Sequence, residues 1–337
     1  MRILLIMDPG IPVPPKLYGG HERLVYLFAE EYAKLGHQVT LLAGPNSHIS
    51  GSVITFGVNE INRSKRQRFK EVLFAWKWLH NNSTGFDLIH NFGRLVYLLP
   101  LLNRPAKKIM TYGRPVSQRG IRLVNKLPNR NMIFTACSNY CVSTGNVAGR
   151  WETVYNAINF ADYQLVEQVD DEAPLMFLGR LDQIKGAHVA IQVAKATGKR
   201  LLLAGNISDQ EDGKAYFDSV IAPQIDQQQI IYLGPLNDEQ KNLYLGQASA
   251  LLFPISWDEP FGLVMIEANA CGTPVIAFRR GSVPEVIEPG VNGIIVDNVD
   301  EMIIEVDNAL KINRKSCRQR AEQRFDVKNI ALDYLNL

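Results

Sequence analysis

The regular alternation of short apolar runs with helical patterns most constrains how this 337-residue chain can fold. Buried strands are expected at residues 2–7, 37–44, 86–92, 107–113 and 131–138, and again at 173–180, 199–206, 229–235, 249–255, 273–278 and 292–297. Helices are expected between them, as at 20–35, 186–198 and 237–248. Such alternation is typical of parallel sheets with helices on both faces. We therefore predict two doubly wound α/β domains that bind ligands at the carboxyl ends of their strands.

The length of the chain favours two domains, and the charge balance changes near residues 154–163. We predict one domain over 1–157, a second over 158–315, and a C-terminal helical segment over 316–337 that packs back toward the first. No apolar run approaches the roughly 20 residues that span a bilayer, and the first residues do not resemble a signal peptide. The four cysteines form neither a CxxC motif nor a disulfide framework, which favours a cytoplasmic location.

The net charge of +2 conceals a strongly basic region. Residues 61–150 contain sixteen lysines and arginines but only two acids, Glu71 and Asp87. Such segregation indicates that one domain meets something anionic, with a solvated charged surface as the alternative. Because the chain contains no recognised nucleic-acid-binding motif, we predict no nucleic-acid partner.

Residues 62–80 concentrate these cations beside aromatic side chains. Five apolar residues recur there at helical spacing: Phe69, Val72, Leu73, Trp76 and Leu79. The stripe is either the core-facing side of a helix or the apolar face of an interfacial helix on an anionic membrane. A docking site for an anionic glycan or lipid-phosphate acceptor would have the same composition. A peripheral location at the inner face of a membrane is therefore an alternative to a purely cytoplasmic one.

Two carboxylates stand out in the stretch 258–274. Glu267 is the only charged residue between Pro260 and Phe278, and Glu259 lies just before them. Ionised carboxylates are rarely buried without partners, so Glu267 needs hydroxyl or N–H donors. Ribose hydroxyls would serve, and a neighbouring backbone segment is the alternative. With Pro260 in the first turn of a helix, the backbone N–H groups that follow would form an anion site.

Two further motifs follow predicted strands. Arg180 and Lys185 lie between a strand and a helix, where fixed cations would stabilise a diphosphate leaving group. A pair of surface cations is the alternative interpretation. Gly19 and Gly20 lie after the first strand and would let the backbone approach an anion at a helix N-terminus, although a plain turn is equally compatible.

These motifs together resemble the retaining glycosyltransferases of the GT-B fold that form glycosyltransferase family 4, related to glycogen and sucrose synthases. Their signature is two glutamates separated by seven residues, which Glu259 and Glu267 match. The G-R…K-G motif at 179–186, Y-G-G at 18–20 and Y-N-A-I-N-F at 155–160 occur in the expected order. The resemblance covers nearly the whole chain. It implies two Rossmann-like domains that face a central cleft.

The resemblance also implies roles for individual residues. Glu267 would hold the ribose of a nucleotide sugar, and Arg180 and Lys185 would neutralise its diphosphate. Glu259 and the backbone of Phe261, Gly262 and Leu263 would bind the sugar hydroxyls and the distal phosphate. Gly19 and Gly20 would close on the diphosphate. Asn206 and Pro235 would lie against the base.

The implied reaction moves a hexose-type sugar, with retention, from a UDP- or GDP-sugar to a glycan, lipid-linked or small-molecule acceptor. No cofactor beyond the donor is expected. The chain has no Asp-x-Asp motif, so we predict no metal.

One departure concerns the end of the strand at 107–113. Where relatives often carry a histidine, this chain has Tyr112, which is a poor base near neutral pH. His90 is a neighbouring strand-end candidate, although a lone histidine is more often structural. The departure keeps two alternatives open: a catalytically weak or silent nucleotide-sugar-binding protein, and an epimerase or hydrolase of the same fold.

Overall fold

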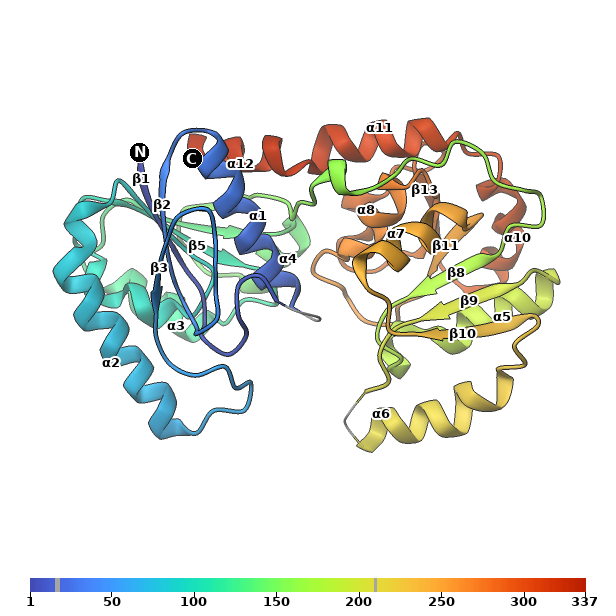
Figure 1. Ribbon diagram of the computed structural model, residues 1–337, viewed down its shortest axis with the longest axis horizontal. Helices are drawn as coiled ribbons and strands as arrows, with labels where there is room; N and C mark the ends of the chain where they lie inside the picture. The colour runs from blue at the N-terminus through green and yellow to red at the C-terminus, as the bar shows by residue number, and fades with distance from the viewer. Residues whose placement is uncertain (16–18, 209–210) are drawn as a thin grey trace. The chain divides into compact units, whose positions relative to one another are not determined.

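The computed structural model describes residues 1–15, 19–208 and 211–337, which form two compact units (Figure 1). The first unit comprises Met1–Ala157 and Val327–Leu337, and the second comprises Ile158–Asp326. Each unit is built on one sheet in which all paired strands are parallel. The prediction of two doubly wound α/β domains is confirmed.

The first sheet has seven strands in the order β3-β2-β1-β4-β5-β6-β7. They are β1 (Arg2–Ile6), β2 (Gln38–Ala43), β3 (Ser52–Thr55), β4 (Leu88–Asn91), β5 (Lys107–Tyr112), β6 (Met132–Ala136) and β7 (Trp151–Thr153). The sequence did not predict β3 and β7. Both are short edge strands with exposed or half-buried side chains, so neither carries the continuous apolar run of a central strand.

Helices cover both faces of this sheet, as the alternating sides of a strand require. Helices α1 (Gly20–Lys34) and α12 (Val327–Asn336) pack on the face that includes Ile3 and Leu5. The opposite face, with Leu4 and Ile6, is covered by α2 (Lys65–Asn82), η2 (Leu95–Leu101) and α3 (Gln118–Lys126). Two short helices complete the unit: η1 (Ser83–Gly85) and α4 (Asn139–Gly145).

Only part of the apolar stripe predicted on α2 faces the core, because Leu79 is buried and Val72 packs on the core while other members of the stripe face away. The helix buries Glu71, Ala75 and Leu79, whereas Phe69 is 63% exposed and Leu73 is 47% exposed. At about 100° per residue, Phe69 and Leu73 lie more than about 100° around the helix from Ala75. The sheet therefore selects a narrower stripe than the one the sequence favoured.

The second sheet has six strands in the order β10-β9-β8-β11-β12-β13. They are β8 (Leu175–Leu178), β9 (Leu201–Ala204), β10 (Ile230–Gly234), β11 (Ala250–Phe253), β12 (Val275–Phe278) and β13 (Gly293–Val296). All six lie within predicted strands.

The helices of the second unit precede, connect or follow its strands. They are η3 (Phe160–Asp162), η4 (Gln183–Lys185), α5 (Ala187–Thr197), α6 (Glu211–Tyr216), η5 (Phe217–Ile221), η6 (Ala222–Gln224), α7 (Asp238–Gln247), α8 (Leu263–Ala270), α9 (Val283–Val286), α10 (Val299–Ala309) and α11 (Arg314–Phe325). Asn237 caps α7 and forms a capping box with Gln240.

The end of the chain is divided between the units. Helix α11 belongs to the second unit and α12 to the first. In the first unit, Tyr334 of α12 is buried with its ring 4.4 Å from that of His90, and Lys107 donates a hydrogen bond to the carbonyl of Leu335. The last helix therefore completes the core of the unit in which the chain begins.

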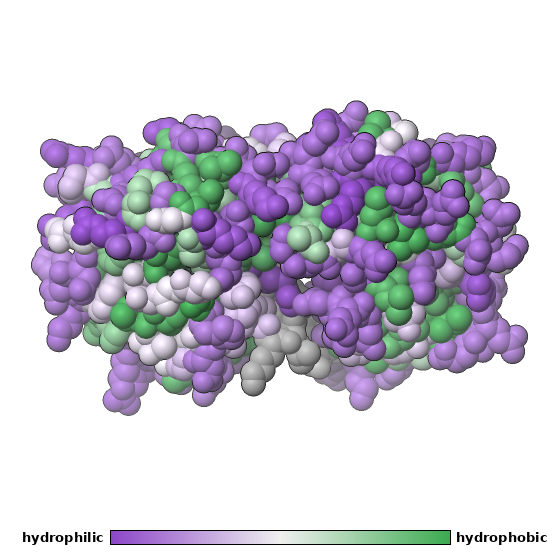
Figure 2. Space-filling model, turned by 45° about the horizontal axis from the view of Figure 1, so that its top comes forward, coloured by the Kyte–Doolittle hydropathy of each residue, from purple (hydrophilic) through white to green (hydrophobic). Residues whose placement is uncertain are grey.

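Figure 2 shows one face of the molecule, where hydrophilic side chains predominate and apolar ones lie among them. Within the described residues, no helix is both long enough and apolar enough to cross a bilayer.

Candidate functional site

The carboxyl edge of the second sheet brings Glu259 and Lys185 together as an ion pair. Lys185 ends η4, which follows β8, and Glu259 lies in the loop after β11. The indole Nε1 of Trp257 donates a 2.9 Å hydrogen bond to Glu259 Oε2, the oxygen that Lys185 also contacts. Lys185 Nζ lies 4.9 Å from the centre of the Trp257 ring. The Glu259 carboxylate is thus held by a cation and an indole, and its side chain remains partly exposed to solvent.

The backbone on either side of Glu259 is fixed by the loop after β12. Ser282 N donates to the Glu259 carbonyl at 3.0 Å, and Ser282 Oγ donates to the Phe261 carbonyl at 2.9 Å. Gly281 has φ 50°, and a Cβ there would overlap the Glu259 carbonyl oxygen and lie 2.6 Å from the Glu259 nitrogen. Only glycine allows this close approach.

Glu267 has a separate set of partners. It lies on α8, is 9% exposed, and accepts a 3.1 Å hydrogen bond from the Tyr163 hydroxyl. Lys241 Nζ on α7 forms a 2.7 Å ion pair with the same oxygen, Oε1. Burial, followed by the charge of Glu267, raises the pKa of Tyr163, so its hydroxyl stays protonated and donates. The partners that the buried carboxylate requires are therefore already present within the protein.

Helix α8 begins three residues later than the predicted first turn at Pro260. Gly262 is the N-cap with φ 80°, a left-handed conformation that suits glycine. Phe261 is buried, with its ring 5.6 Å from that of Phe325. The side chain of Phe261 thus anchors the segment that leads into α8 at Leu263.

The loops after β8, β9 and β10 carry the other predicted donor residues. Arg180 forms an ion pair with Asp182, and its side chain is 46% exposed. Asn206 and Pro235 are exposed, and the Asn206 carbonyl accepts a 2.9 Å hydrogen bond from Leu181 N. The structure therefore places all the predicted residues of the second unit at one edge of its sheet.

In the first unit, the predicted glycines begin α1. Gly19 is the N-cap and Gly20 the first helical residue, while Tyr18 of the same motif lies outside the described residues. A Cβ at Gly19 would lie 2.8 Å from Pro15 Cβ, so a larger residue would crowd the preceding loop.

His90 and Tyr112 occupy different environments in the same unit. His90 is fully buried, its Nε2 lies 2.8 Å from Thr111 Oγ1, and its Nδ1 has no hydrogen-bond partner within the described residues. Burial lowers the pKa of His90 to about 3, so the imidazole is a neutral part of the core. Tyr112 ends β5, is half-buried and packs 5.9 Å from the Trp151 ring. Burial raises the pKa of Tyr112.

Another histidine, which the sequence analysis did not select, lies beside Tyr112. A Cβ on Gly113 would overlap His21 Nε2, so the imidazole from α1 lies directly against the end of β5. Burial and the charge of Arg114 lower the pKa of His21 to about 4, which keeps the ring neutral near pH 7. The contact between His21 and Gly113 has no signal in the sequence, because it depends on how α1 packs against the end of β5.

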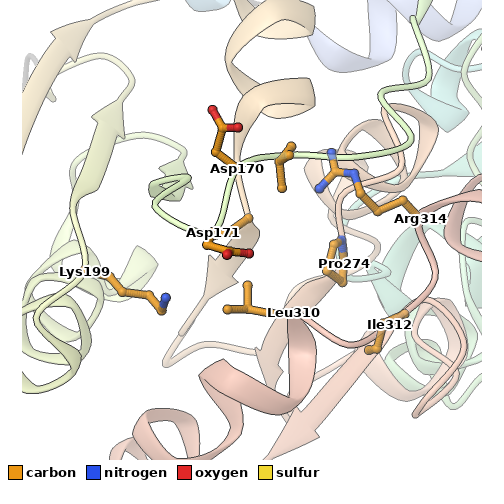
Figure 3. A pocket seen from close by; sticks show the side chains of 9 residues that line it. Asp170, Asp171, Lys199, Pro274, Leu310, Ile312 and Arg314 are labelled. Atoms are coloured by element: carbon orange, nitrogen blue, oxygen red, sulfur yellow. The ribbon is translucent and has the colours of Figure 1, made fainter.

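A pocket of about 300 Å³ opens elsewhere on the second unit (Figure 3). Its lining includes Lys199, Ser249 and Pro274, which precede β9, β11 and β12, so it lies at the amino edge of the sheet. Arg314 also lines it, but the Arg314 guanidinium is occupied by the carbonyls of Val166, Gly246 and Ala248 and by Thr273 Oγ1. The pocket contains no predicted site residue. Among the described residues, no group of three or more His, Cys, Asp or Glu could hold a metal ion.

Two family models match the chain. "Glycosyl transferases group 1" matches residues 164–324, and "Glycosyltransferase Family 4" matches residues 18–142. Together they span most of both units. The chain belongs to glycosyltransferase family 4. The predicted resemblance is therefore confirmed at the level of the family.

This family 4 member is similar in sequence to curated glycosyltransferases. It is 36% identical over 135 residues to the D-inositol 3-phosphate glycosyltransferase of Mycolicibacterium smegmatis. The match covers 39% of this chain and 30% of that protein. The chain spans between 30% and 57% of the length of the first curated relatives it matches.

Solved structures match it over nearly their whole length. Sucrose-phosphate synthase from Thermosynechococcus elongatus is 22% identical with a TM-score of 0.78, covering 99% of this chain and 97% of that one. HepE of Anabaena in complex with UDP and glucose is 20% identical with a TM-score of 0.74, covering 100% and 98%. These similarities confirm the GT-B fold.

Proposed function

We propose that this protein is a retaining glycosyltransferase that transfers a hexose-type sugar from a UDP- or GDP-sugar. The observation that carries the proposal is the pair of carboxylates, Glu259 and Glu267, on either side of the start of α8. Each has its own partners, Lys185 and Trp257 for the first, Tyr163 and Lys241 for the second. Two carboxylates with separate partners suit two different parts of one substrate better than a single acid–base pair.

In this proposal Glu267 binds the ribose of the donor. Its Oε1 is already engaged by Tyr163 and Lys241, which fix the carboxylate and leave Oε2 to accept ribose hydroxyls. Asn206 and Pro235 lie against the base, because they follow neighbouring strands at the same sheet edge.

The diphosphate is assigned to Lys185 and Arg180, whose charges offset the negative charge that develops as the leaving group departs. Glu259, with the backbone of Phe261, Gly262 and Leu263, binds the sugar hydroxyls and the distal phosphate. Gly19, Gly20 and Tyr112 of the first unit serve the diphosphate and the sugar. His90 is left out of the proposed site because its imidazole is fully buried.

The proposed transfer breaks the bond between the anomeric carbon and the phosphate oxygen and forms a bond from the acceptor oxygen on the same face. The acceptor proton passes to the departing phosphate oxygen, so the reaction requires neither a strong protein base nor a cofactor. We propose that it also requires no metal, since the two cations take the role that a metal would have at the diphosphate.

Three similar proteins support this proposal. HepE, which shares the fold, binds UDP and glucose, and sucrose-phosphate synthase and D-inositol 3-phosphate glycosyltransferase are named for sugar transfer. The acceptor is proposed as a glycan, a lipid-linked sugar or a small molecule. Variable loops decide which acceptor is bound, and the residues assigned here to the donor do not determine that choice.

A ligand screen tests the donor. Because a ligand bound only by the native state raises apparent stability, the correct UDP- or GDP-sugar should raise the melting temperature. Transfer is then followed with that donor, with and without a chelator, and NMR of the product gives the anomeric configuration. An inverted product or a loss of transfer on chelation would contradict the proposed reaction.

The same screen separates the alternatives. A nucleotide sugar that binds tightly, with no turnover across a broad acceptor panel, would indicate a silent binding protein. Conversion of the donor without any acceptor would indicate an epimerase or hydrolase.

A further inference from the structure

We infer that α2 and α3 of the first unit form a docking surface for an anionic lipid bilayer. Both helices pack on the same face of the first sheet and both contact η2, so their outer sides belong to one helical layer (Figure 1). This outer side, the α2–α3 surface, combines a one-signed charge with exposed apolar side chains.

The charge of the surface is entirely positive. On its outer side helix α2 exposes four cations: Lys65, Arg66, Lys70 and Lys77. Its one acid, Glu71, is 3% exposed and is paired with Arg63 and Arg94 at 2.8 and 2.6 Å. Helix α3 adds the exposed cations Arg119, Arg122 and Lys126 and contains no acid. Each cation near an anionic leaflet contributes to binding, and no exposed acid on these helices opposes it.

Apolar side chains lie among these cations. Phe69 and Leu73, one turn apart on α2, are 63% and 47% exposed, and Leu123 of α3 is 51% exposed. A purely polyanionic ligand would need only the charges. Phenylalanine and leucine between lysines and arginines suit a bilayer interface, where the apolar groups leave water and the cations meet lipid headgroups. This mixture favours a lipid bilayer over an anionic glycan or nucleic acid.

The surface is also held rigidly. Ser64 and Gln67 form a capping box at the start of α2, and Trp76 Nε1 donates a 2.8 Å hydrogen bond to the Val96 carbonyl. Phe74 stacks on Phe56 with ring centres 6.0 Å apart. The cationic and apolar side chains are therefore presented by a helix already fixed on its sheet, and binding need not order it.

Co-sedimentation of the full chain with vesicles tests this inference. We expect binding to vesicles that contain phosphatidylglycerol, weakening as salt is raised, and little binding to pure phosphatidylcholine. Changing Lys65, Arg66, Lys70 and Lys77 to glutamine should lower the partition coefficient at least about 100-fold. Replacing Phe69 and Leu73 by serine should lower it at least about 10-fold, because the apolar contribution is lost.

Matched controls come from the second unit. The quadruple change of Lys195, Arg200, Lys214 and Lys311 to glutamine removes the same charge, and Ile304→Ser with Val220→Ser removes comparable exposed apolar area. Both controls should bind vesicles like the unaltered chain.

Two results would overturn the inference. One is an absence of binding to the anionic vesicles. The other is binding that survives the serine changes and is lost only with the cations, which would mark a general polyanion surface. Far-UV circular dichroism confirms that each variant is folded. Binding of nucleotide sugars, which involves none of these residues, should be unchanged in all of them, so this test and that of the proposed activity fail separately.

Discussion

Trp257 and Glu259 are joined by a 2.9 Å hydrogen bond from the indole nitrogen to carboxylate Oε2, and only one residue separates them in the chain. Lys185, which is 74 positions away, contacts the same oxygen. The second oxygen, Oε1, is thereby directed away from these two partners. This arrangement fixes the orientation of the carboxylate before any ligand binds.

Glu259→Gln should lower the rate of sugar transfer at least about 100-fold, because a neutral amide loses the charge-assisted contact with Lys185 and grips the sugar less well. Binding of the free nucleoside diphosphate should change much less than transfer, since Glu267 and its partners are untouched and the backbone of 261–263 still meets the distal phosphate. The measurements are kcat with the donor identified by the ligand screen and the Kd for the free nucleoside diphosphate. Asp307→Asn, at an exposed position on α10, is the charge-matched control. Transfer at the unaltered rate would remove Glu259 from the site.

Glu267→Gln should instead weaken nucleotide binding by about 10- to 100-fold, since a buried acceptor of hydrogen bonds loses its charge. Lys241→Met tests whether the ion pair of 2.7 Å orients the carboxylate. We expect Lys241→Met to raise the Kd less than Glu267→Gln does. The double variant should have nearly the same Kd as Glu267→Gln alone. Isothermal titration gives all three values. Additive effects in the double variant would show that Lys241 acts independently of Glu267.

Gly281→Ala should disturb the loop that carries Glu259, because its Cβ would lie 2.6 Å from the Glu259 nitrogen. Gly290 is the matched control: its φ is 79° against 50° for Gly281, but a Cβ there meets nothing within 4 Å. Both alanines carry the cost of a left-handed conformation, about 1–2 kcal/mol, and only the first adds a steric overlap. Gly281→Ala should therefore lower the free energy of unfolding by about 1–3 kcal/mol more than Gly290→Ala. Urea denaturation measures both, and equal values would contradict the close approach.

Most strands could be predicted because a strand buried on both faces reads as a continuous apolar run, as in Arg2–Ile6 and Leu201–Ala204. Edge strands lack that signal, which is why Ser52–Thr55 and Trp151–Thr153 were missed. The face of α2 could not be predicted for a different reason. Its apolar residues extend around much of the helix, and only the position of the sheet decides which of them are buried.

The two site carboxylates could be selected from the sequence because each is a charge beside or within an apolar segment. The partners of Glu267 could not. Tyr163 is 104 positions from Glu267, and Lys241 is 26 positions from it, so neither carries a local signal. The same holds for His21, which reaches the end of β5 only through the packing of α1.

The stability of the first unit should depend on pH through His90. Its pKa is lowered by burial from 6.5 to about 3, so the unfolded chain binds a proton that the folded protein does not. The contribution is fully present above about pH 6.5 and is lost as the pH falls toward 3. At pH 5 the loss amounts to about 2 kcal/mol.

His90→Gln keeps a polar contact to Thr111 but cannot be protonated. The difference in unfolding free energy between pH 7.5 and pH 5 should therefore shrink by about 2 kcal/mol in this variant. His80→Gln, at an exposed position on α2, should leave that difference unchanged. Urea denaturation at the two pH values decides, and an unaltered difference in His90→Gln would show that His90 is not the group that titrates.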